Sequence, residues 1–234
     1  MWSGPRNIST AMMRGFENRA DCAVIDEPFY AAYLAATGLD HPMRARVLTS
    51  QPRDWRIVAA RLVRDAPEPV VYQKHMTHHM IAGFGLDWMA ACRNAFLIRD
   101  PAAVLASYVR KRAQVTLEDI GVVRQRELFD READRLGAAP PVIDGADVLA
   151  DPVRALAWLC AALDVPFDEA MLSWPAGSRD SDGVWAPAWY EAVERSTGFE
   201  APRRQEPPAL TDHLRRIADQ ARPHYEALAR YRLG

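Results

Sequence analysis

Short apolar runs that end abruptly in polar residues constrain the fold of this chain more than any other feature of its sequence. Four runs have the composition and length of buried strands: Ala23–Ile25, Val70–Gln73, Ala95–Ile98 and Pro141–Ile143. Helical patterns lie between them, and this alternation is typical of βαβ units around a parallel sheet. The sequence therefore predicts an α/β fold, with a mainly parallel central sheet in a three-layer α/β/α arrangement.

The helical stretches are defined by their apolar spacing and by their start signals. Four are predicted in the first two thirds of the chain: Ser9–Arg19, Pro101–Gln114, Leu117–Leu136 and Pro152–Leu163. The second has the clearest start, since Asp100 is placed to cap the helix and proline occupies its first position.

The C-terminal part has a different composition. Residues Ser173–Pro208 are rich in Pro, Gly, Trp and charge, so we expect a long irregular segment there, and loops of such length are often functional. A helical pattern over Thr211–Leu233 predicts a packed terminal helix. The 234 residues are expected to form one domain, residues 1–234, with this irregular segment inside it.

Composition excludes several classes of protein. The formal charge of −2 gives no general attraction to nucleic acid or to acidic membranes. Three widely spaced cysteines form no CxxC pattern, and the longest apolar run, Ala155–Leu163, is far shorter than the roughly 20 residues of a membrane-spanning helix. No signal segment is recognisable. We therefore expect a cytoplasmic protein without nucleic-acid or membrane partners, and a homo-oligomer is compatible with this composition.

Polar residues follow three of the predicted strands directly. They are the pairs Asp26-Glu27, Lys74-His75 and Arg99-Asp100. Open α/β sheets bind ligands at the carboxyl ends of their strands, so these pairs predict a site at that edge.

A loop over residues 3–10 leads into the first predicted helix. Its backbone N–H groups and hydroxyls can converge on an anion at the helix N-terminus, and its candidate binding residues are Pro5, Arg6, Asn7, Ile8, Ser9 and Thr10. The loop is not the common nucleotide triphosphatase loop, because Ile8-Ser9 stands where that pattern needs Gly-Lys. The plainer interpretation is an ordinary loop capped by Ser9 or Thr10.

A second candidate phosphate site combines the end of one strand with the helix that follows. Arg99 ends the strand and Ser107 lies two turns into the helix, so both can reach one phosphate. Alternatively, Arg99 pairs with an acid and Ser107 lies on an unrelated helix face.

Together these two segments resemble the family of sulfotransferases that use 3′-phosphoadenosine 5′-phosphosulfate. Pro5, Arg6, Ser9 and Thr10 match the family's loop around the 5′-phosphosulfate, and Arg99 with Ser107 matches its 3′-phosphate pair, with the same spacing of eight. The resemblance implies a P-loop-like fold, this nucleotide as sulfuryl donor, no metal, and transfer to a hydroxyl or amine of a small-molecule or carbohydrate acceptor.

The chain also departs from the family pattern. Arg6 replaces the commoner lysine, Asn7-Ile8 replaces Ser-Gly, and Ala11 stands where relatives often have an aromatic residue that stacks on adenine, which another group must then hold. Arg203-Arg204 is only a loose counterpart of the late basic segment of many relatives. The strand before the loop must be very short, or the natural start lies upstream.

Three residues are candidates for catalysis. Arg6 is the expected cation at the leaving nucleotide oxygen. Glu27 resembles the Glu-Pro element of carbohydrate-type relatives, and His75 resembles the histidine of the Lys-Thr-His segment of cytosolic ones, with Gln73 in place of the lysine. An ordinary histidine is mostly neutral at pH 7 and is the stronger base, so the sequence favours His75. Glu27 could instead only order Arg6 through an ion pair.

Neighbouring residues leave further alternatives open. His75, His78 and His79 could form a metal site, but no carboxylate or cysteine accompanies them at ligand spacing, and we expect His78 and His79 at the surface. A group of late aromatics could line an acceptor pocket or simply pack in the core: Trp174, Trp185, Trp189 and Tyr190.

Two other functions remain open from the sequence. One is a catalytically silent nucleotide-binding module, because the loop departs from the family pattern. The other is a kinase-like phosphotransferase, which would need a lysine on the phosphates that this loop lacks.

Overall fold

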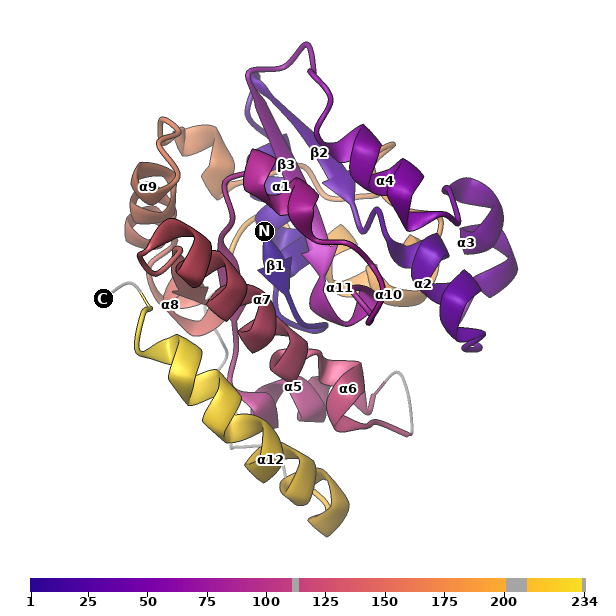
Figure 1. Cartoon of the computed structure of the whole chain (residues 1–234). Helices are drawn as coiled ribbons and strands as arrows, with labels where there is room; N and C mark the ends of the chain where they lie inside the picture. The colour runs from indigo at the N-terminus through magenta and orange to yellow at the C-terminus, as the bar shows by residue number, and fades with distance from the viewer. Residues whose placement is uncertain (111–113, 201–209, 233–234) are drawn as a thin grey trace.

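A five-stranded parallel sheet forms the centre of the protein in the computed structural model, which describes residues 1–110, 114–200 and 210–232 (Figure 1). The strands are β1 (Trp2–Ser3), β2 (Cys22–Asp26), β3 (Val70–Met76), β4 (Phe96–Ile98) and β5 (Val142–Asp144). Their order is β2-β3-β1-β4-β5, and every pair is parallel. The α/β prediction is thus confirmed, and the strand expected before the loop is two residues long.

The short first strand lies where the direction of winding reverses. β1 pairs with β3 on one side and with β4 on the other. After β1 the chain forms β2 and β3 on one side of it, and then crosses to form β4 and β5 on the other. Such a switch point opens a crevice outside the carboxyl ends of the strands. The loop after β1 therefore starts at the place in the sheet where a ligand fits best.

Alternation along the strands gives the sheet two apolar faces. Tyr72, Leu97 and Ile143 join one core cluster, while Phe96 and Val142 join another. The first face is covered by α1 (Ser9–Glu17), α8 (Gly145–Ala150), α9 (Pro152–Ala162) and the 3₁₀ turn η3 (Glu169–Leu172). The second is covered by α4 (Trp55–Leu62), η2 (Asp87–Ala91), α7 (Val122–Leu136) and α12 (Asp212–Ala229). The protein has the three layers that the sequence predicts.

The remaining described elements surround the carboxyl edge of the sheet. They are α2 (Tyr30–Thr37), α3 (Arg44–Ser50), η1 (Thr77–His79), α5 (Pro101–Tyr108), α6 (Leu117–Ile120), α10 (Ala186–Trp189) and α11 (Glu191–Glu194). No helix within the described ranges has both the length and the apolar composition that crossing a bilayer requires.

Two predicted helices differ from the observed ones. The helix that starts at Pro101 ends at Tyr108, and part of the longer prediction lies outside the described residues. The stretch predicted as one helix from Leu117 to Leu136 is divided at Gly121, which has a φ of 68°. A side chain there would also meet the Thr77 hydroxyl at 2.5 Å, so only glycine allows η1 to pack this closely.

The C-terminal part partly matches its prediction. The described portion of the segment from Ser173 to Pro208 contains the short helices α10 and α11 between irregular stretches. The candidate pair Arg203-Arg204 lies outside the described residues. The terminal helix α12 begins after Thr211, whose hydroxyl accepts from the Leu214 N–H, and ends at Ala229.

The late segment is fixed to α1 by a buried ion pair. The Arg14 side chain is fully buried, and its guanidinium contacts Asp182 at 2.7 Å and Glu17 at 3.3 Å. Ser181 donates a short hydrogen bond to the same Glu17. These contacts join residues that are far apart in the sequence, and they place the segment around Asp182 beside α1, the helix that follows the loop of residues 3–10.

Removing Asp182 is expected to destabilise the fold substantially. Asp182→Ala leaves the Arg14 guanidinium buried without its nearer partner, and breaking a buried pair from one side costs about 3 kcal/mol or more. Urea unfolding followed by circular dichroism would measure this loss. The exposed pair of Arg215 and Asp212 supplies the matched control, because Asp212→Ala should change the free energy of unfolding little. Equal effects of both substitutions would contradict the structural role of Arg14.

Candidate functional site

The loop between β1 and α1 has the backbone conformation of an anion cradle. Arg6 (φ 58°) and Ile8 (φ 48°) both adopt left-handed conformations, and turns of this kind gather successive N–H groups into one concavity. Ile8 caps α1 without any side-chain hydrogen bond to the first turn, so those N–H groups are left to a ligand. The Asn7 amide donates to the Leu97 carbonyl at 2.6 Å and holds the loop against β4.

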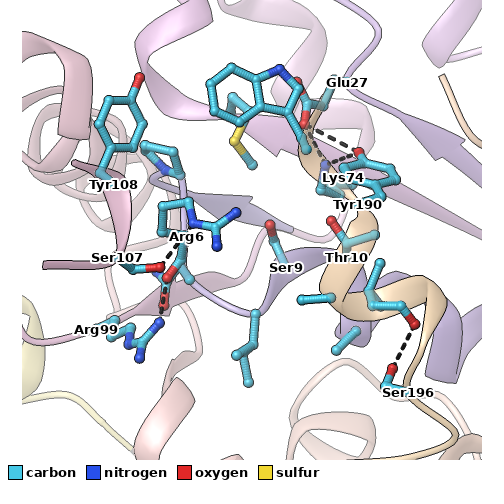
Figure 2. A pocket seen from close by; sticks show the side chains of 18 of the residues that line it. Arg6, Ser9, Thr10, Glu27, Lys74, Arg99, Ser107, Tyr108, Tyr190 and Ser196 are labelled. Atoms are coloured by element: carbon cyan, nitrogen blue, oxygen red, sulfur yellow. Dashed lines mark hydrogen bonds and ion pairs between the residues drawn. The ribbon is translucent and has the colours of Figure 1, made fainter. Parts of the chain in front are cut away.

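The second predicted phosphate site meets this loop directly (Figure 2). Arg99 Nη1 donates to the Arg6 carbonyl at 2.6 Å, and Arg6 Nε donates to the Ser107 hydroxyl at 3.0 Å. Asp100 caps α5 by accepting from the Ala102 and Ala103 N–H groups, which fixes the position of Ser107 relative to Arg99. Two segments about ninety residues apart thus form one polar surface.

This surface is the wall of a cavity of about 350 Å³. Eight positions predicted from the loop and from the Arg-Ser pair line it: Pro5, Arg6, Asn7, Ile8, Ser9, Thr10, Arg99 and Ser107. Glu27 lines it as well, at the tip of β2. Ala11, the position without the expected aromatic ring, also faces this space.

The cavity carries positive charge on its loop side. Burial lowers the pKa of Arg6, and the nearby guanidiniums of Arg99 and Arg110 lower it further. Burial also lowers the pKa of Arg99, against the attraction of Asp144 and Asp100. Among the described residues no carboxylate forms an ion pair with Arg6 or Arg99. Partly buried cations that repel one another are stabilised by an anionic ligand.

Glu27 lies at the opposite side of the cavity in a buried charged cluster. It has a φ of 39°, which is unusual for a residue with a long side chain. Its carboxylate accepts from Lys74 Nζ at 2.5 Å. The pKa of Glu27 is raised above its usual value, chiefly by burial. The positive charge of Lys74 opposes this shift, and the negative charge of the neighbouring Asp26 adds to it. The partner of Glu27 is therefore Lys74, and not Arg6 as the alternative interpretation had it.

His75 does not line the cavity. It is buried on the other face of the sheet, stacked on Trp2 with ring centroids 4.4 Å apart, and its Nε2 lies 3.1 Å from the Gln73 side-chain oxygen. Burial lowers the pKa of His75 well below its usual value. The reason is the length of β3, which runs to Met76 and not to Gln73, so that strand alternation turns Lys74 and Met76 to the cavity and His75 away.

Aromatic and imidazole side chains line the region of the cavity next to Glu27. His79, expected at the surface, is 2% exposed and stacks on Tyr30 with ring centroids 4.6 Å apart. Tyr30 is also hydrogen-bonded to His41 at 3.0 Å, and all three line the cavity with His78. Within the described ranges, no group of three or more His, Cys, Asp or Glu residues is arranged to hold a metal ion.

The late aromatic residues divide between the two roles that the sequence left open. Trp189 and Tyr190 line the cavity, whereas Trp174 and Trp185 are packed in the interior. No sequence motif indicated a role for Lys74, although it is one of only two lysines in the chain and the alternation of β3 turns it toward the cavity.

Known proteins with similar sequences provide an independent comparison. The family described as "Sulfotransferase domain" matches residues 1–231. Two Arabidopsis thaliana proteins, named branched-chain-amino-acid aminotransferase-like protein 1 and 2, are 35% and 34% identical to this chain, over 87% of its length. The chain spans only 36% of the length of each of them, and their name describes those longer proteins.

Solved structures of sulfotransferases share the fold. The sulfotransferase domain from the curacin biosynthetic pathway has a TM-score of 0.55 at 19% identity, covering 94% of this chain and 95% of its own. The sulfotransferase domain of the Synechococcus PCC 7002 olefin synthase has a TM-score of 0.56 at 16% identity, covering 94% and 92%. A sulfotransferase from Alicyclobacillus acidocaldarius gives 0.53 at 13%, covering 99% and 96%. With the family match over almost every residue, this chain belongs to the sulfotransferase domain family.

Proposed function

We propose that this protein transfers a sulfuryl group from 3′-phosphoadenosine 5′-phosphosulfate to a hydroxyl or amine of a small-molecule or carbohydrate acceptor. The observation that carries the proposal is the single cavity into which the β1 loop, Arg99 and Ser107 bring positive charge on one side and Glu27 brings a carboxylate on the other. The positively charged side suits a doubly phosphorylated nucleotide, and the Glu27 carboxylate on the other side is suited to take the proton of the acceptor.

The proposed donor fits the polar groups that line the cavity. The loop hydroxyls of Ser9 and Thr10, with the N–H groups at the start of α1, would hold the 5′-phosphosulfate. Arg99 and Ser107 would hold the 3′-phosphate, and both are hydrogen-bonded to Arg6 of the loop. Arginine suits this task because its planar guanidinium presents several donors to one phosphate.

In the proposed reaction, an acceptor oxygen or nitrogen attacks the sulfur while the bond from sulfur to the bridging nucleotide oxygen breaks. Negative charge grows on that oxygen, and the guanidinium of Arg6 would stabilise it. The attacking group loses its proton to the carboxylate of Glu27, whose basicity burial increases. The products are the sulfated acceptor and adenosine 3′,5′-bisphosphate. Geometry thus favours Glu27 over His75 as the general base.

Nucleotide-dependent stabilisation tests the proposal directly. Adenosine 3′,5′-bisphosphate at about 100 times its dissociation constant should stabilise the protein by about 2.7 kcal/mol, because it binds only the folded state. In a thermal shift assay this nucleotide should raise the melting temperature of the protein, whereas ATP with Mg²⁺ should change that temperature little. A rise with ATP and Mg²⁺ alone would favour a phosphotransferase and contradict the proposal.

Removing Arg99 should affect nucleotides according to their 3′-phosphate. Arg99→Ala is expected to weaken binding of adenosine 3′,5′-bisphosphate about 10- to 100-fold, the range for lost hydrogen bonds to a charged group, and to change AMP binding little. Isothermal titration calorimetry with both nucleotides measures this difference. Arg215→Ala, at an exposed position of α12, is the control and should leave both affinities unchanged. Equal losses for the two nucleotides would refute the assignment of Arg99 to the 3′-phosphate.

A further inference from the structure

Glu27 belongs to a buried cluster of four ionisable residues. Lys74 Nζ donates to Asp26 at 2.9 Å, to Glu27 at 2.5 Å and to the Tyr190 hydroxyl at 2.8 Å (Figure 2 shows Lys74 with Glu27 and Tyr190). The four residues are between 1% and 8% exposed. They come from β2, from β3 and from the end of α10, so the cluster exists only in the folded chain.

The hydrogen bonds distinguish the two carboxylates of the cluster. Asp26 accepts from Lys74, from the Gly183 N–H at 3.1 Å and from the Tyr190 hydroxyl at 2.7 Å. Glu27 accepts from Lys74, and its distance to the Tyr190 hydroxyl is longer, at 3.4 Å. A hydroxyl has one proton to donate, and the shorter distance assigns it to Asp26. Asp26 is therefore the better stabilised anion of the pair.

The charges of the cluster give the direction of proton uptake. One ammonium and two carboxylates leave one excess negative charge in a buried site, and a single proton makes the cluster neutral. Asp26 does not line the cavity, whereas Glu27 and Lys74 do. The proton that neutralises the cluster therefore comes from the cavity and binds to Glu27, the carboxylate that accepts fewer hydrogen bonds.

We propose that Asp26 and Tyr190 are positioning residues that make Glu27 the proton acceptor of the reaction: Asp26 takes the hydrogen bonds of Tyr190 and Gly183, which leaves Glu27 with fewer donors, and Tyr190 orients Asp26 together with Lys74. This proposal rests on the proposed function, because it assigns Glu27 the proton of the attacking group. The hydroxyl of Tyr190 suits its task, since it accepts from Lys74 and from Trp185 Nε1 at 3.1 Å while donating to Asp26.

Burial favours the neutral forms of two tyrosines and one histidine near Glu27. Tyr30 faces it from α2, and burial followed by the charge of Glu27 raises the pKa of that hydroxyl far above its usual value. Burial also raises the pKa of Tyr190 well above its usual value. The imidazole of His79, from η1, lines the same cavity, and burial lowers its pKa well below the usual value. These three groups therefore add no charge to that of Asp26, Glu27 and Lys74.

Two substitutions should move the titration of Glu27 in opposite directions. Asp26→Asn removes the like charge and leaves Lys74 to Glu27 alone, so the titration midpoint of Glu27 should move to lower pH. Tyr190→Phe removes a donor from the carboxylate pair, so the midpoint should move to higher pH. Opposite shifts are a consequence of the cluster that a purely structural role of these residues would not produce.

Carbon-13 NMR can measure these midpoints without knowledge of the acceptor. The side-chain carboxyl carbons of glutamate are labelled, the Glu27 signal is assigned by its loss in Glu27→Gln, and pH titrations are run with and without adenosine 3′,5′-bisphosphate. Tyr72→Phe is the matched control. Tyr72 lies on β3, as Lys74 does, and its hydroxyl is buried without a hydrogen-bond partner among the described residues. It should leave the Glu27 midpoint in place.

The outcomes separate this inference from the proposed function. Opposite shifts in Asp26→Asn and Tyr190→Phe, with an unchanged Tyr72→Phe, support the assignment of roles. Unmoved midpoints, or shifts in the same direction, overturn it even where the nucleotide still binds and the proposed function stands. If Asp26→Asn fails to fold, the sign of the shift in Tyr190→Phe decides alone. Loss of nucleotide binding by the unmodified protein would instead overturn the proposed function.

Discussion

Replacing Arg6 by alanine is expected to lower the rate of sulfuryl transfer about 100- to 1,000-fold, the range for loss of one preorganised donor to a developing oxyanion. Affinity for adenosine 3′,5′-bisphosphate should fall by much less, because charge on the leaving oxygen grows only in the transition state. The rate can be followed as release of this nucleotide from 3′-phosphoadenosine 5′-phosphosulfate in the presence of phenol, alcohol and amine acceptors, or with water as the acceptor.

Two variants make the Arg6 result specific. Arg6→Lys keeps the positive charge and should recover part of the rate, although it loses the planar guanidinium whose Nε donates to Ser107. Arg56→Ala removes a guanidinium that is 70% exposed and does not line the cavity, and this variant should behave as the unmodified protein. A normal rate with weakened nucleotide binding in Arg6→Ala would reduce Arg6 to a residue that positions the donor.

Replacing Glu27 by glutamine should cost roughly 100-fold or more in rate while nucleotide binding survives, because the amide cannot accept the acceptor proton. The pH dependence should report the same group. Burial raises the pKa of Glu27, so the rate should fall as the pH drops through that raised value and the carboxylate becomes protonated. In Glu27→Gln this acidic limb should disappear from the profile of kcat/KM against pH.

His75 provides the comparison, since the sequence by itself favours it as the base. His75→Phe keeps a ring in the stack with Trp2 and should retain most of the rate, because the imidazole does not line the cavity. A near-complete loss in His75→Phe beside a nearly normal Glu27→Gln would restore the histidine to the mechanism. Circular dichroism should first establish that both variants fold, so that lost packing is not read as lost chemistry.

Features carried by local pattern could be predicted from the sequence. The strand predicted at Ala95–Ile98 is observed as β4, Phe96–Ile98, and Asp100 caps α5 as predicted; both features depend on neighbours in the chain. The loop before α1 is also local, because its turn and the helix start that follows are set by consecutive residues. The predicted binding residues of both segments consequently line one cavity.

The surroundings of the carboxylate could not be predicted in this way. Lys74 meets Tyr190 across 116 residues, and its contact with Glu27 spans 47. No periodicity in the sequence connects such positions, because the contact depends on where β3 ends and on how the late segment folds back. β3 continues beyond Gln73 to Met76, and the alternation of side chains along this extension decides which of Lys74 and His75 faces the cavity.

The sequence by itself therefore determined the parallel α/β architecture and the side of the cavity suited to phosphates, since strands, caps and loop turns follow from residues close together in the chain. Only the tertiary structure decided which group can take a proton. That property depends on burial and on the balance of one ammonium against two carboxylates, and both arise when β2, β3 and the segment around Tyr190 pack against one another.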